Sequence, residues 1–256
     1  MCLITLAYRS HPDYPLLLAA NRDEFYQRPT ATLDFWDDAP ELLAGRDLEA
    51  GGTWMGITRS GRFAAITNHR NPPSTPQNPR SRGMLTVDFL LGDQAAEQYL
   101  QAVARRAGEY AGFNLLLGDA DGLYYFSNIE SQVRTLPAGI YSVSNGLLDS
   151  AWPKQRIAEQ GLTTLLQAPL QHEQLKATVS DRSKADDTQL PQTGVGLELE
   201  RTLSSQFIVA DGYGTRATTS LWVHRSGEVE LSESTFVEHG QAAGCRQLGF
   251  SLSGRE

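Results

Sequence analysis

The sequence predicts an α+β protein built from antiparallel sheets, and three observations support this class. Short runs of apolar and β-branched residues recur along the chain between clusters of turn-forming residues. Several runs are joined by tight polar turns, such as DADG at 119–122 and RSG at 59–61 and 225–227, which is typical of β-hairpins. Helical patterns stand between groups of strands rather than after every strand, and this favours antiparallel sheets over a parallel one.

The expected strands are short segments rich in aliphatic and aromatic residues. In chain order they are CLITLAY at 2–8, LLLAA at 16–20, TWMGIT at 53–58, RFAAIT at 62–67, FNLLLGD at 113–119, GLYYFSN at 122–128, GIYSVSN at 139–145, SLWVH at 220–224 and GEVEL at 227–231. The segment 94–107 is expected to form a helix because Ala96 and Tyr99 begin an apolar stripe. A second helix is expected over 153–167, where apolar residues repeat with helical spacing after Pro153 in the first turn.

The length of 256 residues corresponds to between one and two average domains. Neither an internal repeat nor a shift in composition marks a boundary, so we expect a single domain over 1–256. Two long loops interrupt the pattern. One lies near 71–80, where NPPSTPQNP holds four prolines, and the other is the polar stretch 181–196. Loops of this length often border binding sites, and we expect both at the rim of a cleft.

The charge balance argues against a nucleic-acid partner, because 22 basic and 30 acidic residues give a net charge of −8. No apolar run approaches the roughly 18 residues that span a bilayer, so no transmembrane segment is expected. The first residues lack a basic leader, and two cysteines cannot form a disulfide framework. These observations lead us to expect a cytoplasmic protein.

Several common catalytic motifs are missing from the sequence. GGTWMG at 51–56 has the glycine spacing of a phosphate-binding loop, but Ile57 and Thr58 follow where a lysine and a hydroxyl residue are required. There is no G-x-S-x-G nucleophile motif, and the five histidines form no H-x-x-x-H pair. We therefore expect neither a nucleotide site nor a metal site.

Cys2 is the first candidate for chemistry because of its position. If the initiator Met is removed, Cys2 carries a free α-amine beside its own thiol. Such an amine titrates near about 7.7–8.0 and a thiol near about 8.5, so the amine can act as a general base for the thiol. The alternative is a buried structural cysteine at the start of a strand, which position alone favours.

The neighbouring strand strengthens the case for a site. If strands 2–8 and 15–21 form a hairpin, Cys2 lies opposite Asp23, within one or two residues. Directly opposed side chains in a hairpin have Cβ atoms about 4.5–5.5 Å apart. A carboxylate there would orient the amine and tune the thiol. The polar cluster NRDE at 21–24 therefore predicts a site facing Cys2.

Motifs spread along the chain also resemble a known family. They are MC at 1–2, NRDE at 21–24, GRFAAITNHR at 61–70, SRG at 81–83, VSNGLLDSAWPK at 143–154 and YGTRATTS at 213–220. They resemble the NRDE family, the transport and Golgi organisation type 2 proteins and their bacterial relatives. That family is similar to N-terminal-nucleophile hydrolases of the penicillin V acylase and bile-salt hydrolase type. The resemblance implies a four-layer αββα sandwich of two antiparallel sheets.

The resemblance also implies site residues. The catalytic set carried over by motif is Cys2, Asp23, Asn145 and Arg216. Candidates for substrate or oxyanion contacts are Asn21, Arg22, Asn68 and, as a rival to Asn68, Asn71. The sequence departs from the hydrolases at one point: they carry an arginine directly before Asn-x-Asp, where this chain has Ala20. Arg22 lies inside the motif instead, and we expect it on the opposite pleat face.

Two functions remain open. The first is an N-terminal cysteine amidohydrolase that cleaves a non-peptide C–N bond and needs no cofactor. The second, which the resemblance implies, is a carrier for haem trafficking or for acyl-CoA and lipid homeostasis that uses the same cleft. Aromatic residues would line that cleft in the carrier: Trp54, Phe63, Trp152 and Trp222. The expected partner is thus a small molecule, a lipid or haem, although the sequence contains no C-x-x-C-H haem motif.

Overall fold

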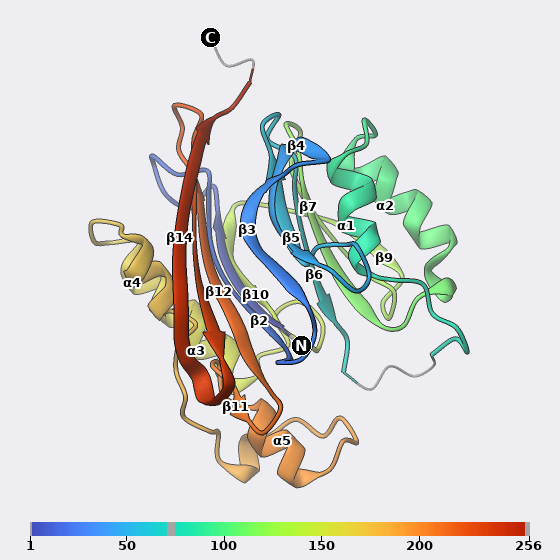
Figure 1. The fold of residues 1–256 in the computed structure, drawn as a ribbon, viewed down its shortest axis with the longest axis vertical. Helices are drawn as coiled ribbons and strands as arrows, with labels where there is room; N and C mark the ends of the chain where they lie inside the picture. The colour runs from blue at the N-terminus through green and yellow to red at the C-terminus, as the bar shows by residue number, and fades with distance from the viewer. Residues whose placement is uncertain (1, 71–74, 254–256) are drawn as a thin grey trace. The chain divides into compact units, whose positions relative to one another are not determined.

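A computed structural model describes residues 2–70 and 75–253, and its strands form two antiparallel sheets (Figure 1). The chain divides into two compact units. The first comprises Met1–Gln27 and Ala138–Gly249, and the second comprises Arg28–Pro137 and Phe250–Glu256. The α+β class with antiparallel sheets is confirmed, while the prediction of a single domain over 1–256 stays a prediction.

The sheet of the first unit has the strand order β10-β1-β2-β12-β13-β14, and β11 pairs with β12. Its strands are β1 (Cys2–Tyr8), β2 (Leu16–Phe25), β10 (Gly139–Val143), β11 (Val209–Ala210), β12 (Tyr213–Val223), β13 (Glu228–Val237) and β14 (Gln241–Ser251). Its α-helices are α3 (Pro153–Leu165), α4 (His172–Ala177) and α5 (Leu197–Leu203), with short 3₁₀ helices η2 (Asp187–Gln189) and η3 (Glu238–Gly240). The α3 helix packs on β10 and β1, and α4 packs on β12 and β2.

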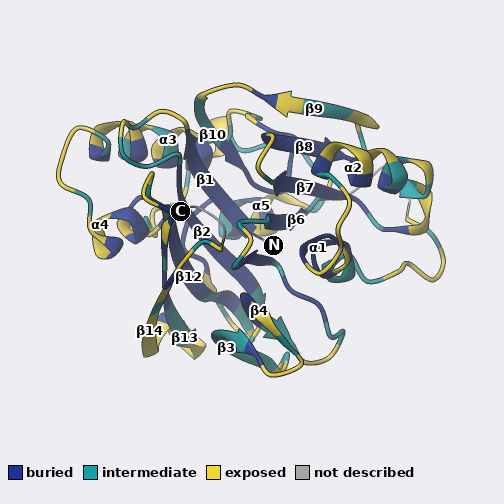
Figure 2. Ribbon diagram, turned by 90° about the horizontal axis from the view of Figure 1, so that it is seen from above, coloured by how far each residue is buried: buried dark blue, intermediate teal, exposed yellow. Residues whose placement is uncertain are grey.

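The alternation of side chains explains this packing. Successive side chains of a strand point to opposite faces, so every second residue of β1 and β2 faces the helices. Leu3 and Leu17 belong to the apolar core beneath α3 and α4, together with Leu162 and Leu175 of those helices. All seven residues of β1 are buried, as their continuous apolar sequence leads one to expect. Figure 2 shows β1 and β2 buried along most of their length, with exposed residues on the outward sides of α3 and α4.

The second unit has a sheet of strand order β3-β4-β5-β6-β7-β8-β9. Its strands are β3 (Thr30–Trp36), β4 (Ala39–Asp47), β5 (Met55–Thr58), β6 (Phe63–Asn68), β7 (Phe113–Gly118), β8 (Leu123–Ser127) and β9 (Gln132–Leu136). Its helices are α1 (Gly83–Leu90), α2 (Ala96–Arg105) and the 3₁₀ helix η1 (Ala107–Glu109). Phe89 of α1 and Leu100 of α2 share one core with Leu115 and Phe126 of the sheet.

Several elements were not expected from the sequence. The α1 helix begins without a side-chain cap, and most of its residues are buried, so it lacks a polar stripe that would reveal helical periodicity. Strand β14 is exposed along most of its length, with Phe250 as its buried residue, and strands β3 and β4 alternate only weakly. The two predicted helices are confirmed, with the first shortened to α2 followed by η1.

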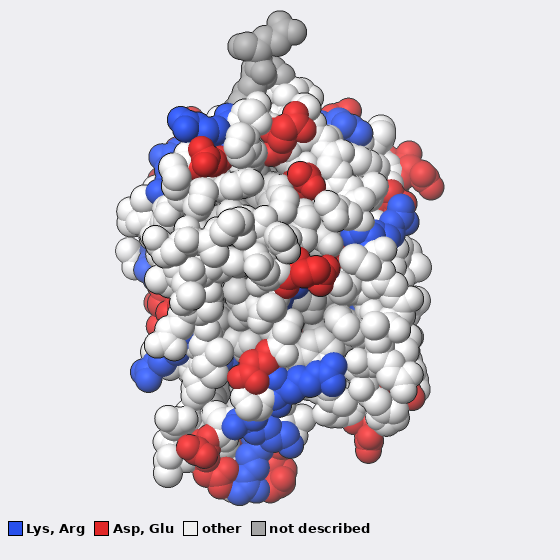
Figure 3. Space-filling model, turned by 90° about the vertical axis from the view of Figure 1, so that its left-hand side faces the viewer, with Lys and Arg blue, Asp and Glu red and all other residues white. Residues whose placement is uncertain are grey.

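The predicted loop at 181–196 is irregular except for the turn of η2, and polar contacts attach it to α5. Arg201 of α5 forms an ion pair with Asp187 of the loop, and the backbone N–H of Thr193 donates to Glu200 Oε1 of α5 at 2.9 Å. Charged residues of both signs gather at the lower end of the face drawn in Figure 3, the end where Figure 1 draws α5. Of the other predicted loop, residues 71–74 lie outside the described residues.

No helix in the described part of the chain combines the length and the apolar character needed to cross a bilayer.

Replacing Leu162 with alanine tests the core of the first unit. Leu162 is fully buried in α3 against β1, so Leu162→Ala should lower the free energy of unfolding by about 2–5 kcal/mol. Ile157→Ala in the same helix is the matched control, because Ile157 is 44% exposed and should change stability by only about 0.5 kcal/mol. Urea denaturation followed by circular dichroism measures both, and equal losses would contradict this packing.

Candidate functional site

Cys2 begins β1, which lies between β10 and β2 in the sheet of the first unit. On one side it pairs directly with Arg22 of β2. On the other side Ile4 pairs with Val143 of β10, and continuing that register by two residues brings Asn145 level with Cys2. Cys2 is only 9% exposed. Cys2 is therefore a buried residue at one end of the sheet, opposite Arg22.

The predicted hairpin of the first two strands is confirmed, but its register differs by one residue. Cys2 lies opposite Arg22 rather than Asp23. The reason is the length of the loop. Tyr8 pairs with Leu16, so an odd number of residues lies between the strands, whereas the predicted register requires an even number. This moves the centre of the hairpin by half a residue. The hairpin therefore stands, but the prediction that the Asp23 side chain faces Cys2 is wrong, because a shift of one residue turns that side chain to the other face of the sheet.

The change of register reverses which polar side chains share a face with Cys2. Directly opposed residues point to the same side of a sheet, so Arg22, expected on the opposite pleat face, lies on the face of Cys2. Leu3 is opposite Asn21 and belongs to the core beneath the helices. Asn21 and Asp23 therefore point toward the helix layer.

Asp23 is buried and contacts the site through both its side chain and its main chain. Thr215 Oγ1 donates to Asp23 Oδ1 at 2.6 Å and accepts from the backbone N–H of Ile208 at 2.9 Å. The backbone N–H of Asp23 donates to the Cys2 thiol. Burial raises the pKa of the Asp23 carboxyl, while the positive charges of the chain terminus and Lys154 and the Thr215 hydrogen bond oppose this rise. The Asp23 carboxyl is thus tuned by several groups at once.

The pKa of the buried Cys2 thiol is raised above its ordinary value by its surroundings. Burial raises its pKa, and the negative charge of Asp23 adds to the rise. The positive charge of the chain terminus, the charge of Arg22 and the Asp23 backbone hydrogen bond act in the opposite direction. A thiol of this kind needs a neighbouring base before it can act as a nucleophile.

Asn145 is completely buried in the segment that follows β10. Ser144 fixes this segment, because its hydroxyl donates to the Cys2 carbonyl oxygen at 2.9 Å and lies 3.4 Å from Asn145 Oδ1. The hydrogen bond from Ser144 extends the contact between β10 and β1 beyond the last regular pair. The Ser144 side chain thus ties the segment that carries Asn145 to the main chain of Cys2.

Arg216 is the extra residue of a β-bulge. The pairing of β12 with β2 shifts register between Thr215 and Ala217, and Ala217 is opposite Arg22. Arg216 Nη1 donates to the carbonyl oxygen of Phe25 at 3.2 Å. Burial lowers the pKa of Arg216, and the nearby positive charge of Arg22 lowers it further. The bulge therefore brings a second guanidinium near Arg22, as bulges at functional sites often re-aim a side chain.

Asn21 is held by three hydrogen bonds within the protein. Its Nδ2 donates to the carbonyl oxygens of Val179 at 2.7 Å and Gln206 at 2.9 Å, and its Oδ1 accepts from Thr218 at 2.7 Å. These bonds join β2 to β12 and to the segments after α4 and α5. These bonds stabilise the fold around Asn21. A contact between Asn21 and a substrate stays a prediction.

The remaining predicted residues lie elsewhere. Asn68 is the last residue of β6 in the second unit, where it pairs with Phe113. Asn71 lies outside the described residues. Across the described ranges 2–70 and 75–253, no three His, Cys, Asp or Glu side chains are grouped so as to hold a metal ion.

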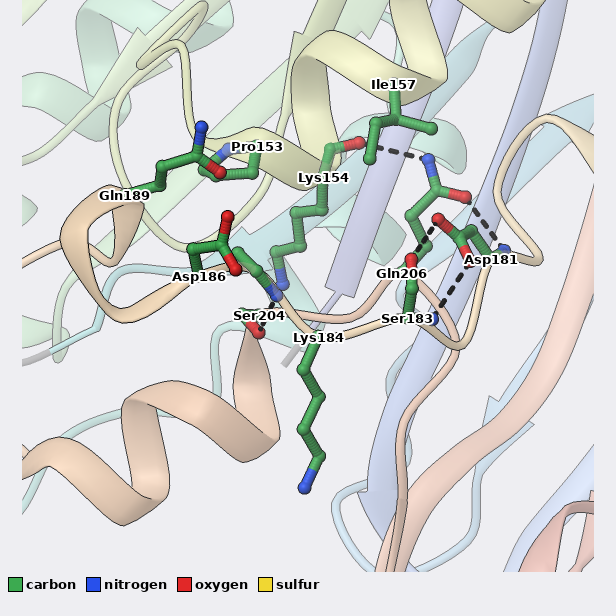
Figure 4. Close-up of a pocket in the computed structure, with 11 residues that line it drawn as sticks. Pro153, Lys154, Ile157, Asp181, Ser183, Lys184, Asp186, Gln189, Ser204 and Gln206 are labelled. Carbon is green, nitrogen blue, oxygen red and sulfur yellow. Dashed lines mark hydrogen bonds between the residues drawn. The ribbon is translucent and has the colours of Figure 1, made fainter.

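Reasoning from the sequence missed two buried polar residues beside Asp23, namely Thr215 and Lys154. Lys154 offered a signal, because a lysine directly after Pro153 in the first turn of a helix opposes the helix dipole. A pocket of about 170 Å³ lies against it, between the start of α3 and segments 181–189 and 204–206 (Figure 4).

Comparisons with known proteins agree with these motifs. The family model described as "Transport and Golgi organisation 2" matches residues 1–238. The Transport and Golgi organization protein 2 homolog of Bos taurus is 34% identical over 259 residues, covering 93% of this chain and 94% of the relative. The homolog of Homo sapiens is 34% identical over 260 residues with the same coverage. The Drosophila melanogaster protein is 27% identical over 274 residues, covering 94% of this chain and 95% of the relative.

Two solved structures also resemble the chain. One is a Caenorhabditis elegans ortholog of N-acylethanolamine-hydrolyzing acid amidase, with a TM-score of 0.47, 10% identity and coverage of 86% of this chain and 92% of that one. The other is the C2A mutant of a conjugated bile acid hydrolase from Clostridium perfringens, with a TM-score of 0.43, 8% identity and coverage of 100% and 95%.

Asn21→Ala should destabilise the protein by about 2–4 kcal/mol, because it leaves a buried hydroxyl and two buried carbonyl groups without their partner. Asn78→Ala is the control, since Asn78 is exposed and its loss should cost about 0.5 kcal/mol or less. Melting temperatures and urea midpoints of the two variants measure the difference. A stable Asn21→Ala protein would show that these bonds contribute little.

The two cysteines should differ in reactivity. Cys245 is exposed, whereas burial shields the Cys2 thiol and raises its pKa. In protein that retains Met1, iodoacetamide should therefore modify Cys245 first at pH 7, and modification of Cys2 should increase as the pH rises toward 10. Peptide mass spectrometry follows each site, with Cys2→Ser and Cys245→Ser as controls. Equal rates at pH 7 would contradict the shielding of Cys2.

Proposed function

The chain belongs to the Transport and Golgi organisation 2 family, and we propose that Cys2, once it is the N-terminal residue, hydrolyses an amide or related acyl C–N bond. The observation that carries this proposal is the position of Cys2 at the start of β1, opposite Arg22 and level with Asn145. The backbone hydrogen bond from Asp23 to the thiol supports it further. We place this activity in the cytoplasm.

The reaction begins with a proton transfer. The free α-amine of Cys2 takes the thiol proton, and the thiolate sulfur attacks the carbonyl carbon of the substrate. A C–S bond forms while the carbonyl π electrons move onto oxygen. When the oxyanion collapses, the C–N bond breaks and the ammonium returns its proton to the departing nitrogen. Water then adds to the thioester in the same manner, which releases the acid and restores Cys2.

The surrounding residues have separate tasks in this proposal. Asp23 orients the amine and stabilises the ammonium that forms. Asn145 donates to the oxyanion, and removing one such donor typically costs a factor of about 10²–10³ in rate. Arg22 and Arg216 supply positive charge on the Cys2 face.

A carrier is the second candidate, and the names of the relatives favour it because they refer to transport rather than hydrolysis. Haem or an acyl lipid would then bind without chemistry. The pocket beside Lys154, at about 170 Å³, is smaller than the roughly 300–1,000 Å³ of typical small-molecule sites. A haem carrier would therefore need another surface of the protein.

Intact-mass spectrometry separates the two functions. Protein verified to begin at Cys2 is incubated with a panel of N-acyl amides and β-lactams, in parallel with haem and acyl-CoA titrations. We expect an added acyl mass on the wild type and on Cys245→Ser, but none on Cys2→Ala. Cys2→Ser should retain only a trace of acylation because a hydroxyl is the poorer nucleophile.

The opposite result would favour the carrier. No adduct on protein beginning at Cys2, together with tight and saturable binding of haem or acyl-CoA, would overturn the hydrolase proposal. The same titration on Cys2→Ala then measures how far the thiol contributes to ligand binding.

A further inference from the structure

Lys154 is a buried cation at a position that disfavours positive charge. It is the second residue of α3, only 2% exposed, and its Nζ donates to the carbonyl oxygen of Leu203 at 3.1 Å. The N-terminal end of a helix carries partial positive charge, so a lysine there is repelled. Burial of an ammonium costs additional free energy unless a negative charge compensates it.

Hydrogen bonds place Lys154 beside the end of strand β2. Gln206 Nε2 donates to the backbone oxygen of Lys154 at 3.0 Å, as drawn in Figure 4. The backbone oxygen of the same Gln206 accepts from Asn21 at 2.9 Å. One residue thus connects the start of α3 to β2, two positions before Asp23. Asp23 points toward this helix layer, because it shares the pleat face of Asn21.

Burial raises the pKa of the Asp23 carboxyl, and the positive charges of the chain terminus and of Lys154 lower it. Other charged and titratable groups near Asp23 are Glu24 on its own strand, the Cys2 thiol on β1 and Tyr26 after β2. Negative charge on any of these makes ionisation of Asp23 harder. The positive charge of Lys154, which comes from the helix layer, favours the ionised form of Asp23 instead.

We propose that Lys154 is a positioning residue whose buried ammonium keeps the Asp23 carboxylate charged, so that this carboxylate can hold the Cys2 α-amine in place. The inference rests on the proposed function for its consequence in catalysis. The electrostatic coupling of Lys154 with Asp23 is independent of any reaction. A neutral Asp23 carboxyl would stabilise the ammonium of Cys2 less well, and proton transfer from the thiol would become harder.

The coupling is measured by carboxyl ¹³C NMR titration of Asp23, with the resonance assigned from Asp23→Asn. Lys154→Met keeps the length and apolar stem of the side chain and removes its charge. We expect this substitution to raise the pKa of Asp23 by about 1–3 units, the usual effect of losing an opposite charge at close range. Lys154→Arg should restore most of the wild-type titration. An unchanged titration in a folded Lys154→Met protein would overturn the proposal.

Lys184 provides the matched control because it lines the same pocket but is exposed, and Figure 4 shows its side chain pointing away from Lys154. Lys184→Met should leave the titration of Asp23 unchanged. An equal effect of Lys184→Met would mean that net charge rather than the buried Lys154 controls Asp23, which would also overturn the proposal.

A reciprocal measurement covers the case in which Lys154→Met fails to fold. Linkage requires that removing the Asp23 charge lowers the pKa of the Lys154 ammonium as much as Lys154 lowers that of Asp23. In Asp23→Asn, the Lys154 side-chain resonances should therefore titrate at lower pH than in the wild type. An unchanged Lys154 titration would overturn the coupling.

Kinetics then distinguish the inference from the proposed function. If Cys2 forms acyl adducts, the rate of acylation can be measured as a function of pH. The acid limb of this profile should move to higher pH in Lys154→Met and return to its wild-type position in Lys154→Arg. It should keep its wild-type position in Lys184→Met. An acid limb that stays in place in Lys154→Met would overturn the positioning role. If the wild type forms no adduct, the hydrolase proposal fails, while the NMR titrations still decide whether Lys154 controls Asp23.

Discussion

The antiparallel pairing of β1 with β2 is the constraint on which the rest of the candidate site depends. It runs without interruption from Tyr8–Leu16 to Cys2–Arg22, and both strands are buried along most of their length. Because a slip of one residue would turn every apolar side chain of a strand to the wrong face, burial fixes this register strongly. The same register decides that Arg22 shares the face of Cys2 while Asp23 points to the helices.

Charge buried beneath the sheet is the second constraint. Asp23 is ionisable and almost fully enclosed, a situation that is costly unless hydrogen bonds and opposite charges compensate it. Thr215 and Lys154 supply that compensation from β12 and α3, two elements far apart in the sequence. The helix layer therefore does more than cover apolar residues, because it also sets the electrostatic environment of the strand end that carries Cys2.

The sequence alone determined the class of fold and the family. Alternating apolar runs, tight turns and the two clearest helical stripes reflect local preferences, and these need no knowledge of distant contacts. The hairpin of β1 and β2 was also predictable, since its strands are continuous apolar runs joined by a short polar loop. Cys2, Asp23, Asn145 and Arg216 could be named as candidates from their motifs, although their roles stay predictions.

Only the tertiary structure decided the register at Cys2, the bulge at Arg216 and the position of Lys154. The register depends on whether the loop between β1 and β2 holds an odd or an even number of residues. The bulge depends on the extra residue between Thr215 and Ala217 where β12 pairs with β2. The position of Lys154 depends on the hydrogen bonds that join Asn21 through Gln206 to α3. Local propensity carries no information about such contacts. They are set by the packing of helices on the sheet and by the need to satisfy buried polar groups, and both arise only when the whole unit has folded.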